Sequence, residues 1–274
     1  MDYSYVSIQE PTFVTGLWDI GRGSLDNTAA NHDWARSFEK YTLQLRSLLS
    51  TGLNIIVYGE KNIQKTVEEF TNAKFVEYDR SEFYKCRFYD TINTIRTSKE
   101  WYDQPTAQWL KNSPQAKLPL YAPITFQKIH FIQKAKEFNP FHSQHFYWID
   151  AGITKNHDIV VLRDMLPKLA KYSKFLFFSL HYPDNTEIHG FLREGIHKYC
   201  NRDFVEYIMK GFFFGGDVRH LSEILALFDT ILSDSLAKGY LGTEESIFTI
   251  MSYQKPDLFD QVRITSCANV PQFL

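Results

Sequence analysis

The amino-acid sequence predicts a single α/β domain with a mostly parallel central sheet and helices on both faces. In the first half of the chain, short apolar runs alternate with amphipathic helical patterns, an alternation typical of parallel sheets. The chain has 274 residues, of which 44% are hydrophobic, enough to bury one large core. We therefore favour one domain over two small ones.

Three strands and two helices alternate in the first 80 residues. Apolar helical positions recur from Trp34 to Leu48, and a second short helix covers the sequence IQKTVEEF. The strands are expected at 12–17 (TFVTGL), 54–59 (NIIVYG) and 74–79 (KFVEYD). From Phe83 to Pro123, four prolines interrupt any long periodicity, so this stretch is expected to be irregular or partly helical.

The second half continues the alternation. A helix from Thr125 leads into a fourth strand that ends near Asp150, and further helices are expected at 159–172 and from Val218 to just before Gly239. A strand is expected at 174–180 (KFLFFSL), a turn between strand and helix at Gly215-Gly216, and a helix that starts at GTEES and stops before Pro256.

The composition argues against several classes of protein. The 30 Lys and Arg residues nearly balance the 32 Asp and Glu residues. The protein therefore has no large positive charge that would attract nucleic acid or an anionic membrane. The three cysteines lack the paired spacing of a zinc site and suggest a reducing compartment. With no signal-peptide pattern and no run long enough to span a bilayer, we expect a protein of the cytoplasm or of the cytoplasmic face of a membrane.

The run FYWIDAGIT places a lone carboxylate, Asp150, at the end of an apolar strand, before the small residues Ala151 and Gly152. Ligands of open α/β sheets bind outside the carboxyl ends of the strands. One interpretation is that Asp150 ligates Mg²⁺ or Mn²⁺, which bridges a substrate diphosphate. The other is that it only caps the following turn.

Two later motifs have both structural and functional interpretations. Gly215 and Gly216 are either a simple turn or a place where backbone approaches a ligand closely. Glu244 and Glu245 are favoured by the helix dipole, with Thr243 as a possible N-cap, but one of them can also act as a general base. Arg22 and Lys128 are the cations best placed to meet phosphates, although surface charge is their ordinary role.

The chain resembles the HtrL/YibB family in four segments: TFVTGLWDIGR, YWIDAGI, FFFGGDV and GTEESIF. The order of these segments resembles the layout of GT-A glycosyltransferases. The resemblance implies a GT-A-like domain over residues 1–274, with a nucleotide-sugar-binding half at about 1–155 and an acceptor-binding half at about 156–274. It implies transfer of a sugar from a nucleotide-diphosphate sugar to a hydroxyl acceptor, with a glycan as the expected acceptor. The cofactor implied is Mn²⁺ or Mg²⁺ at Asp150, although Gly152 stands where that family of enzymes has a second aspartate.

The resemblance also assigns residues. Glu245 is the first choice and Glu244 the second for the catalytic role. The residues assigned to the nucleotide sugar are Thr15, Gly16, Arg22, Tyr58, Lys128, Asp150, Ala151 and Gly152, and those assigned to the acceptor are Gly215, Gly216 and Asp217.

Two other functions stay open. A non-catalytic module that binds nucleotide or carbohydrate on the same fold would account for the missing second aspartate. A metal-dependent phosphoesterase would need more carboxylate or histidine ligands than one strand end supplies.

Overall fold

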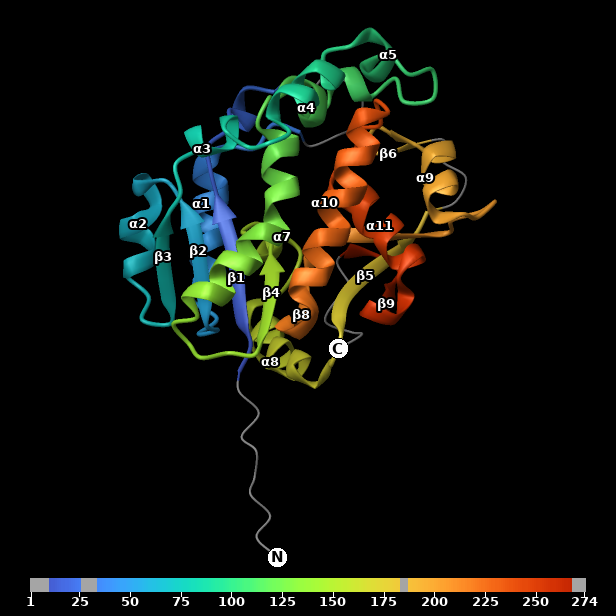
Figure 1. Cartoon of the computed structure of the whole chain (residues 1–274). Coiled ribbons are helices and arrows are strands. Elements are labelled where there is room, and N and C mark those ends of the chain that lie inside the picture. Colours follow the sequence, from blue (N-terminus) through green and yellow to red (C-terminus); the bar gives the residue numbers. More distant parts are fainter. Residues whose placement is uncertain (1–9, 26–33, 183–186, 268–274) are drawn as a thin grey trace, which may run out of the picture.

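The computed structural model describes residues 10–25, 34–182 and 187–267, which form a seven-stranded sheet between two layers of helices (Figure 1). The strand order is β3-β2-β1-β4-β8-β5-β9. The strands are β1 (Thr12–Leu17), β2 (Ile55–Gly59), β3 (Ala73–Glu77), β4 (His145–Ile149), β5 (Phe175–His181), β8 (Tyr207–Asp217) and β9 (Phe259–Ile264).

The sheet is mostly parallel. β1 pairs in parallel with β2 and β4, β2 pairs in parallel with β3, and β5 pairs in parallel with β9. β8 runs antiparallel to both of its neighbours, β4 and β5. The predicted α/β class, with a mostly parallel central sheet and flanking helices, is confirmed.

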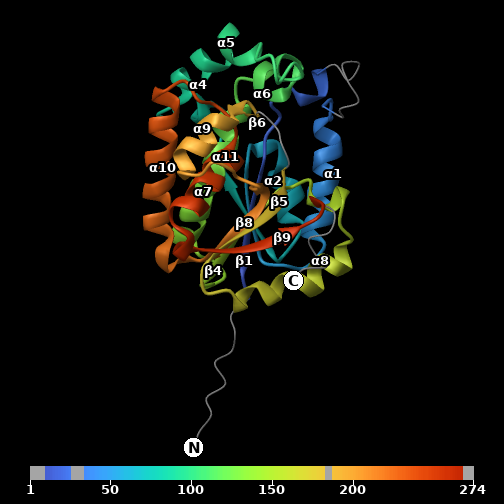
Figure 2. The same cartoon turned by 90° about the vertical axis from the view of Figure 1, so that its right-hand side faces the viewer.

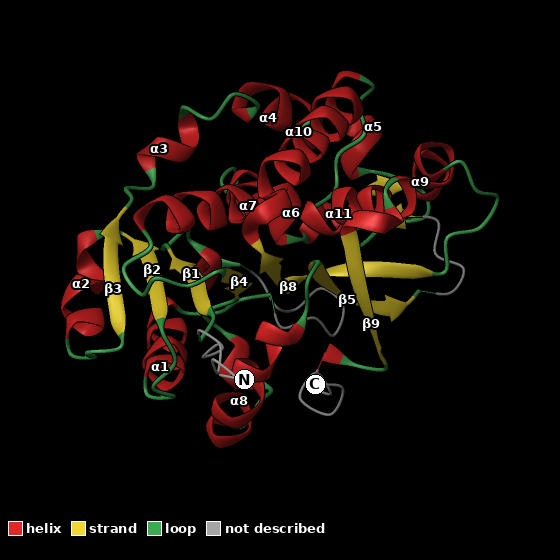
Figure 3. Ribbon diagram, turned by 60° about the horizontal axis from the view of Figure 1, so that its bottom comes forward, coloured by secondary structure: helices red, strands yellow, loops and turns green. Residues whose placement is uncertain are grey.

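Helices cover both faces of the sheet (Figures 2 and 3). One face packs against α7 (Tyr121–Phe138), α10 (Leu221–Ala237) and α11 (Glu244–Gln254), and the other against α1 (Phe38–Leu49), α2 (Lys61–Glu68) and α8 (Ile159–Met165). Fully buried side chains fill each layer, Phe131 and Phe248 on the first face and Leu48 on the second. Each of these helices therefore buries apolar side chains against the sheet.

The proline-rich stretch is partly helical, as expected. It contains the helices α3 (Ser81–Tyr84), α4 (Tyr89–Arg96), α5 (Lys99–Tyr102) and α6 (Pro114–Lys117) and a 3₁₀ turn at Leu110–Asn112. The helix expected from Thr125 begins earlier, at Tyr121, so Pro123 lies in its first turn. Proline is tolerated there because first-turn N–H groups have no partner within the helix.

The turn predicted at Gly215-Gly216 is wrong, because both residues lie inside strand β8. Their φ angles are 146° and 156°, which favour glycine. A Cβ on Gly215 would lie 2.2 Å from the carbonyl oxygen of Phe146, and one on Gly216 would lie 2.3 Å from that of Lys174. The glycines therefore allow β8 to pack closely between β4 and β5.

Strand β9 was not predicted. It lies at the edge of the sheet, and only its first and last residues are buried, so its sequence lacks the apolar run of a central strand. The remaining strands form the hairpin of β6 (Glu187–Ile188) and β7 (Phe191–Leu192), and the remaining α-helix is α9 (Arg193–Cys200). None of the helices in the described part of the chain is both long and apolar enough to cross a membrane.

Candidate functional site

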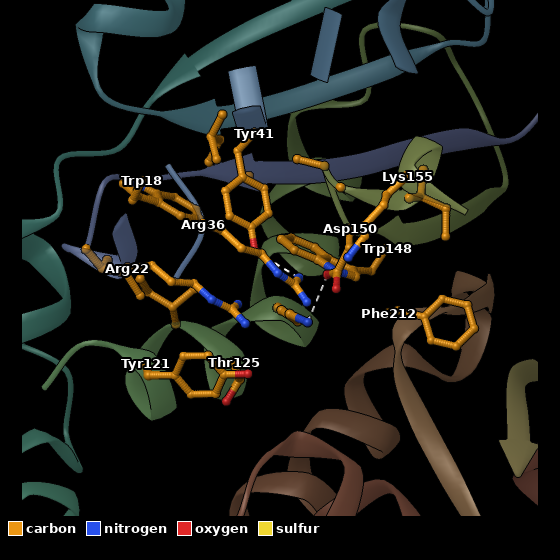
Figure 4. A pocket seen from close by; sticks show the side chains of 18 of the residues that line it. Trp18, Arg22, Arg36, Tyr41, Tyr121, Thr125, Trp148, Asp150, Lys155 and Phe212 are labelled. Carbon is orange, nitrogen blue, oxygen red and sulfur yellow. Dashed lines mark hydrogen bonds and ion pairs between the residues drawn. The ribbon is translucent and has the colours of Figure 1, made fainter. Parts of the chain in front are cut away.

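A cavity of about 510 Å³ opens at the carboxyl ends of β1 and β4 (Figure 4). From β1 the chain continues through α1 to β2, which lies on one side of β1. The strand on the other side of β1 is β4. Such a change of direction leaves a crevice between two parallel strands, where open α/β sheets bind their ligands. Trp18 follows β1, Asp150 follows β4, and Tyr121 of α7 lines the opposite wall.

Basic side chains converge on this cavity. Figure 4 shows Arg22, Arg36 and Lys155 pointing towards the same space. Nε of Arg22 donates to the carbonyl oxygen of Trp34 at 3.1 Å, and its guanidinium lies 5.9 Å from the ring centroid of Tyr121. Nη1 of Arg36 lies 3.3 Å from the hydroxyl of Tyr41. Guanidinium groups fixed in this way are suited to bind phosphate oxygens.

Lys128 is the centre of a buried charge network. Its Nζ lies 2.9 Å from Oδ1 of Asp150 and 2.8 Å from Oε1 of Glu244, and it donates to the carbonyl oxygen of Gly211 at 3.0 Å. Nε1 of Trp148 donates to the same Oδ1 of Asp150 at 2.7 Å. Burial disfavours the ammonium, but the two carboxylates outweigh it and hold the pKa of Lys128 above its usual value.

Glu244 lies beneath the cavity and does not line it. It is 3% exposed, and its Oε2 has no hydrogen-bond partner among the described residues. Burial raises the pKa of Glu244 above its usual value, and the Lys128 ammonium only partly offsets this effect. The space for its carboxylate depends on Gly211, where a Cβ would lie 2.1 Å from Oε1.

Glu245 forms a second charge network at the cavity. Its Oε2 lies 2.9 Å from Nε2 of His189 and also contacts Nζ of Lys210, while its Oε1 accepts a 3.0 Å hydrogen bond from the backbone N–H of Gly211. Burial opposes its ionisation, but the Lys210 ammonium and His189 outweigh burial and hold the pKa of Glu245 well below its usual value. Glu245 is therefore an ionised carboxylate and a weak base.

The two networks share strand β8 and helix α11. Lys210 and Gly211 are consecutive on β8, and Glu244 and Glu245 open α11, where the helix dipole favours carboxylates. Thr243 occupies the N-cap position, as expected, but its side chain makes no capping hydrogen bond. The acidic pair is therefore held by the lysines and by Gly211, and not by the cap.

The site does not fit a divalent cation held by the protein alone. Oδ1 of Asp150 is already shared by the Lys128 ammonium and the Trp148 indole. Within residues 10–25, 34–182 and 187–267, no group of three or more His, Cys, Asp or Glu side chains is arranged to hold a metal ion. Mg²⁺ and Mn²⁺ need several oxygen ligands, so most would have to come from phosphate and water.

Most of the residues predicted for the nucleotide sugar meet at this cavity. Those that line it are Gly16, Arg22, Lys128, Asp150, Ala151 and Gly152, and Glu245 joins them. Thr15 and Tyr58 do not line it, because both are buried in the sheet. The ring of Tyr58 packs against Phe131, with 4.6 Å between centroids.

The three residues predicted for the acceptor lie elsewhere. Gly215 pairs with Tyr147 and Gly216 with Phe146, near the start of β4, whereas the cavity lies beyond its end. Gly215 lies four positions along β8 from Gly211, a distance of about 13 Å. Asp217 accepts hydrogen bonds from N and Nε of Arg219. These three residues therefore lie away from the cavity, and their assignment to the acceptor stays a prediction.

Sequence reasoning missed several lining residues. Arg36, Lys155 and His189 occur in polar stretches where nothing in the pattern distinguishes them. Lys210 did give a signal, because a lysine within the apolar run IMKGFFF is expected to have a buried partner.

The fold and the cavity define a class: an α/β protein with a basic cavity at the point where the strand order reverses. The family model described as "Bacterial protein of unknown function (HtrL_YibB)" matches residues 9–266. The chain belongs to this family, as its sequence motifs suggested.

Two solved structures match most of this chain at low sequence identity. Mouse xyloside xylosyltransferase 1, in its apo form, is 10% identical with a TM-score of 0.42, and the match covers 92% of this chain and 84% of that chain. The 4-diphosphocytidyl-2C-methyl-D-erythritol synthase of Anaerococcus prevotii is 13% identical with a TM-score of 0.43, covering 95% and 89%. A search of the curated proteins found no match.

Proposed function

We propose that this protein is a glycosyltransferase that moves a sugar from a nucleotide-diphosphate sugar to a hydroxyl group of a saccharide. The observation that carries the proposal is the convergence of Arg22, Arg36 and Lys155 on a cavity beside two carboxylate–lysine networks. A basic pocket suits a diphosphate, and ordered charges beside it suit the reacting sugar.

In this proposal the diphosphate binds on the side of the cavity near Arg22 and Arg36. Lys128, which was also expected to meet phosphates, is occupied by Asp150 and Glu244. At Gly152 a Cβ would lie 3.2 Å from the ring of Tyr41, so the small residue keeps this edge of the cavity open. The basic residues Arg22, Arg36 and Lys155 all fall within the proposed donor half, about 1–155.

The transfer step needs a base, and His189 fits that role better than Glu245. Because ionised Glu245 can only accept a hydrogen bond, Nε2 of His189 is the donor and Nδ1 is left to accept a proton. In the proposed step, the acceptor oxygen bonds to C1 of the sugar, and its proton passes to Nδ1. The bond from C1 to the diphosphate breaks with its electron pair on the diphosphate, where the arginines stabilise the charge.

The two glutamates then have different tasks. Glu245 orients His189 and adds negative charge beside the sugar carbon, where positive charge develops. Glu244 is a positioning residue that holds Lys128, and through it Asp150, in place. No step is assigned to Mn²⁺ or Mg²⁺, and the dependence on either ion stays a prediction.

Binding of nucleoside diphosphates tests the donor site. We expect UDP, GDP, ADP or dTDP to bind in calorimetry, and Arg36→Gln to weaken that binding about tenfold or more. Arg46→Gln is the matched control, because Arg46 pairs with Glu69 at an exposed surface. Equal effects of the two variants, or no binding by any of the four, would contradict the donor site.

A non-catalytic binding module is the second candidate. It is favoured by the pairing of Asp150 with Lys128, which neutralises the carboxylate that was expected to hold a metal. In that case nucleotide would bind and depend on Arg36, but no nucleotide sugar would be consumed.

A further inference from the structure

A second cavity, of about 430 Å³, adjoins the first. Arg22, Tyr121 and His189 line both cavities, so the two meet at the histidine to which the proposed function assigns the proton transfer. Its volume lies within the range of about 300–1,000 Å³ that is usual for sites of small ligands. Neither the family description nor the similar structures assign a ligand to it.

Aromatic side chains form much of its wall. The four rings are Trp34 from the segment before α1, Trp109 from the segment before α6, Tyr121 from α7 and Tyr182 directly after β5. Flat aromatic rings with a polar edge suit ligands that have both apolar faces and hydroxyl groups. Sugar rings have this character.

The aromatic wall is held in place by polar contacts. Nε1 of Trp109 donates to Oε1 of Glu187 at 3.2 Å, and Oε2 of Glu187 accepts a 2.7 Å hydrogen bond from the backbone N–H of Gly190. The guanidinium of Arg193 lies 5.8 Å from the ring centroid of Tyr182 and donates to its carbonyl oxygen at 2.5 Å. Binding sites with side chains fixed in this way lose little conformational entropy when they bind.

The second cavity also offers an unused acceptor. Gln115 lines it and is 7% exposed, and its Oε1 has no hydrogen-bond partner among the described residues. A buried acceptor without a partner is costly, and a ligand hydroxyl would relieve that cost. Among the described residues of the lining, the Asp, Glu, Lys and Arg side chains are Arg22 and Glu187, one of each sign, in contrast to the basic first cavity. This balance favours an uncharged ligand.

We propose that the second cavity binds the acceptor, and that the acceptor is an uncharged saccharide. Its ring stacks on Trp109, one hydroxyl donates to Oε1 of Gln115, and the reacting hydroxyl points towards His189. The inference rests on the proposed function, since it assigns the acceptor of that reaction. It also replaces Gly215, Gly216 and Asp217, the acceptor residues expected from the sequence.

The test uses the whole chain and four uncharged disaccharides: lactose, maltose, cellobiose and diacetylchitobiose. We expect calorimetry to detect binding of at least one of them, with a Kd of about 1 mM or tighter. Trp109→Ala should weaken it about tenfold or more. Gln115→Met should also weaken it, and this variant keeps the size of the side chain and removes an atom that has no partner. Phe204→Ala, at an exposed position, is the control.

The same variants separate the two proposals. Trp109→Ala and Gln115→Met should bind nucleoside diphosphate as the unchanged protein does. Disaccharide binding that depends on Trp109, in a protein that binds no nucleotide, would support the second cavity and overturn the donor site. The inference is overturned if none of the disaccharides binds, if binding is the same in Trp109→Ala and Gln115→Met, or if nucleoside diphosphate competes with it.

Discussion

Nζ of Lys128 lies 2.9 Å from Oδ1 of Asp150, so the carboxylate that ends β4 is paired with a buried cation from α7. The sequence suggested that this carboxylate holds a metal ion, but the structure places an ammonium group beside it. The same ammonium reaches Glu244 at 2.8 Å. One lysine therefore links the end of β4 to the start of α11.

Replacement of this lysine should be strongly destabilising. Lys128→Met leaves the buried carboxylate of Glu244 without its cation, and we expect a loss of about 3–5 kcal/mol in the free energy of unfolding. Urea denaturation measures it. Lys134→Met, at an exposed position on the same helix, should change stability by less than about 0.5 kcal/mol.

A double variant identifies the cause. Adding Glu244→Gln to Lys128→Met removes the unpaired charge, so part of the lost stability should return. If the double variant is no more stable than Lys128→Met, the loss comes from packing and not from charge.

The glycine pair of β8 should matter for the sheet and not for ligand binding. In Gly215→Ala the new Cβ would collide with the backbone of β4, 2.2 Å from the carbonyl oxygen of Phe146. We expect a loss of about 1–3 kcal/mol, with unchanged affinity of the folded protein for nucleoside diphosphate. Gly23→Ala, where the closest contact would be 3.4 Å, is the stability control. Weaker nucleotide binding in Gly215→Ala would contradict its remoteness from the cavity.

Acid should remove the stability that Glu245 contributes. Because its pKa is held below the usual value of about 4.5, that contribution is complete above pH 4.5 and is lost as the pH falls from there towards the folded-state pKa. The stability difference between the unchanged protein and Glu245→Gln should therefore shrink between pH 5 and pH 3. Glu137→Gln, at an exposed carboxylate, is the control. A difference that stays constant over this range would show that Glu245 is not stabilised by its charge.

Removal of divalent cations should have little effect on nucleotide binding. The arginines meet the diphosphate, and Asp150 is already paired, so EDTA is expected to weaken binding of nucleoside diphosphate by less than about tenfold. Calorimetry with EDTA and with Mn²⁺ measures the effect. A complete loss of binding in EDTA would mean that an ion bridges the diphosphate and the protein, as was first expected for Asp150.

His189→Ala should reduce turnover far more than donor binding. General bases contribute about 10²–10⁴-fold to rate, so we expect a fall of that size in kcat with nearly unchanged affinity for the nucleoside diphosphate. His181→Ala, at an exposed histidine, is the control. An equal loss of affinity for nucleoside diphosphate would assign His189 to donor binding.

The sequence predicts the parallel part of the fold well. The strands at 12–17 and 54–59 are apolar and bounded by turn signals, and they appear as β1 and β2 with little change. The antiparallel β8 was harder to foresee, because strand direction depends on tertiary pairing and not on local pattern. Its glycines look like a turn in the sequence, yet they serve close strand packing.

The site is predictable only in part, for a similar reason. Asp150 and Arg22 follow strands whose ends can be read from the sequence, so their place at the cavity could be inferred. His189 and Arg36 reach the cavity from loops and short segments, whose paths no periodicity determines. The pairing of Lys128 with both Asp150 and Glu244 joins residues up to 116 positions apart, and a single sequence does not reveal such contacts.

The most direct test of the central claim is the rate at which nucleoside diphosphate is released from a nucleotide sugar. The measurement uses UDP-, GDP-, ADP- and dTDP-sugars with a saccharide acceptor, and mass spectrometry identifies the product. We expect release from one nucleotide class, transfer of its sugar to the acceptor, and loss of both in Arg36→Gln. If nucleotide binds but neither release nor transfer occurs with any donor, the protein is a binding module and not a glycosyltransferase.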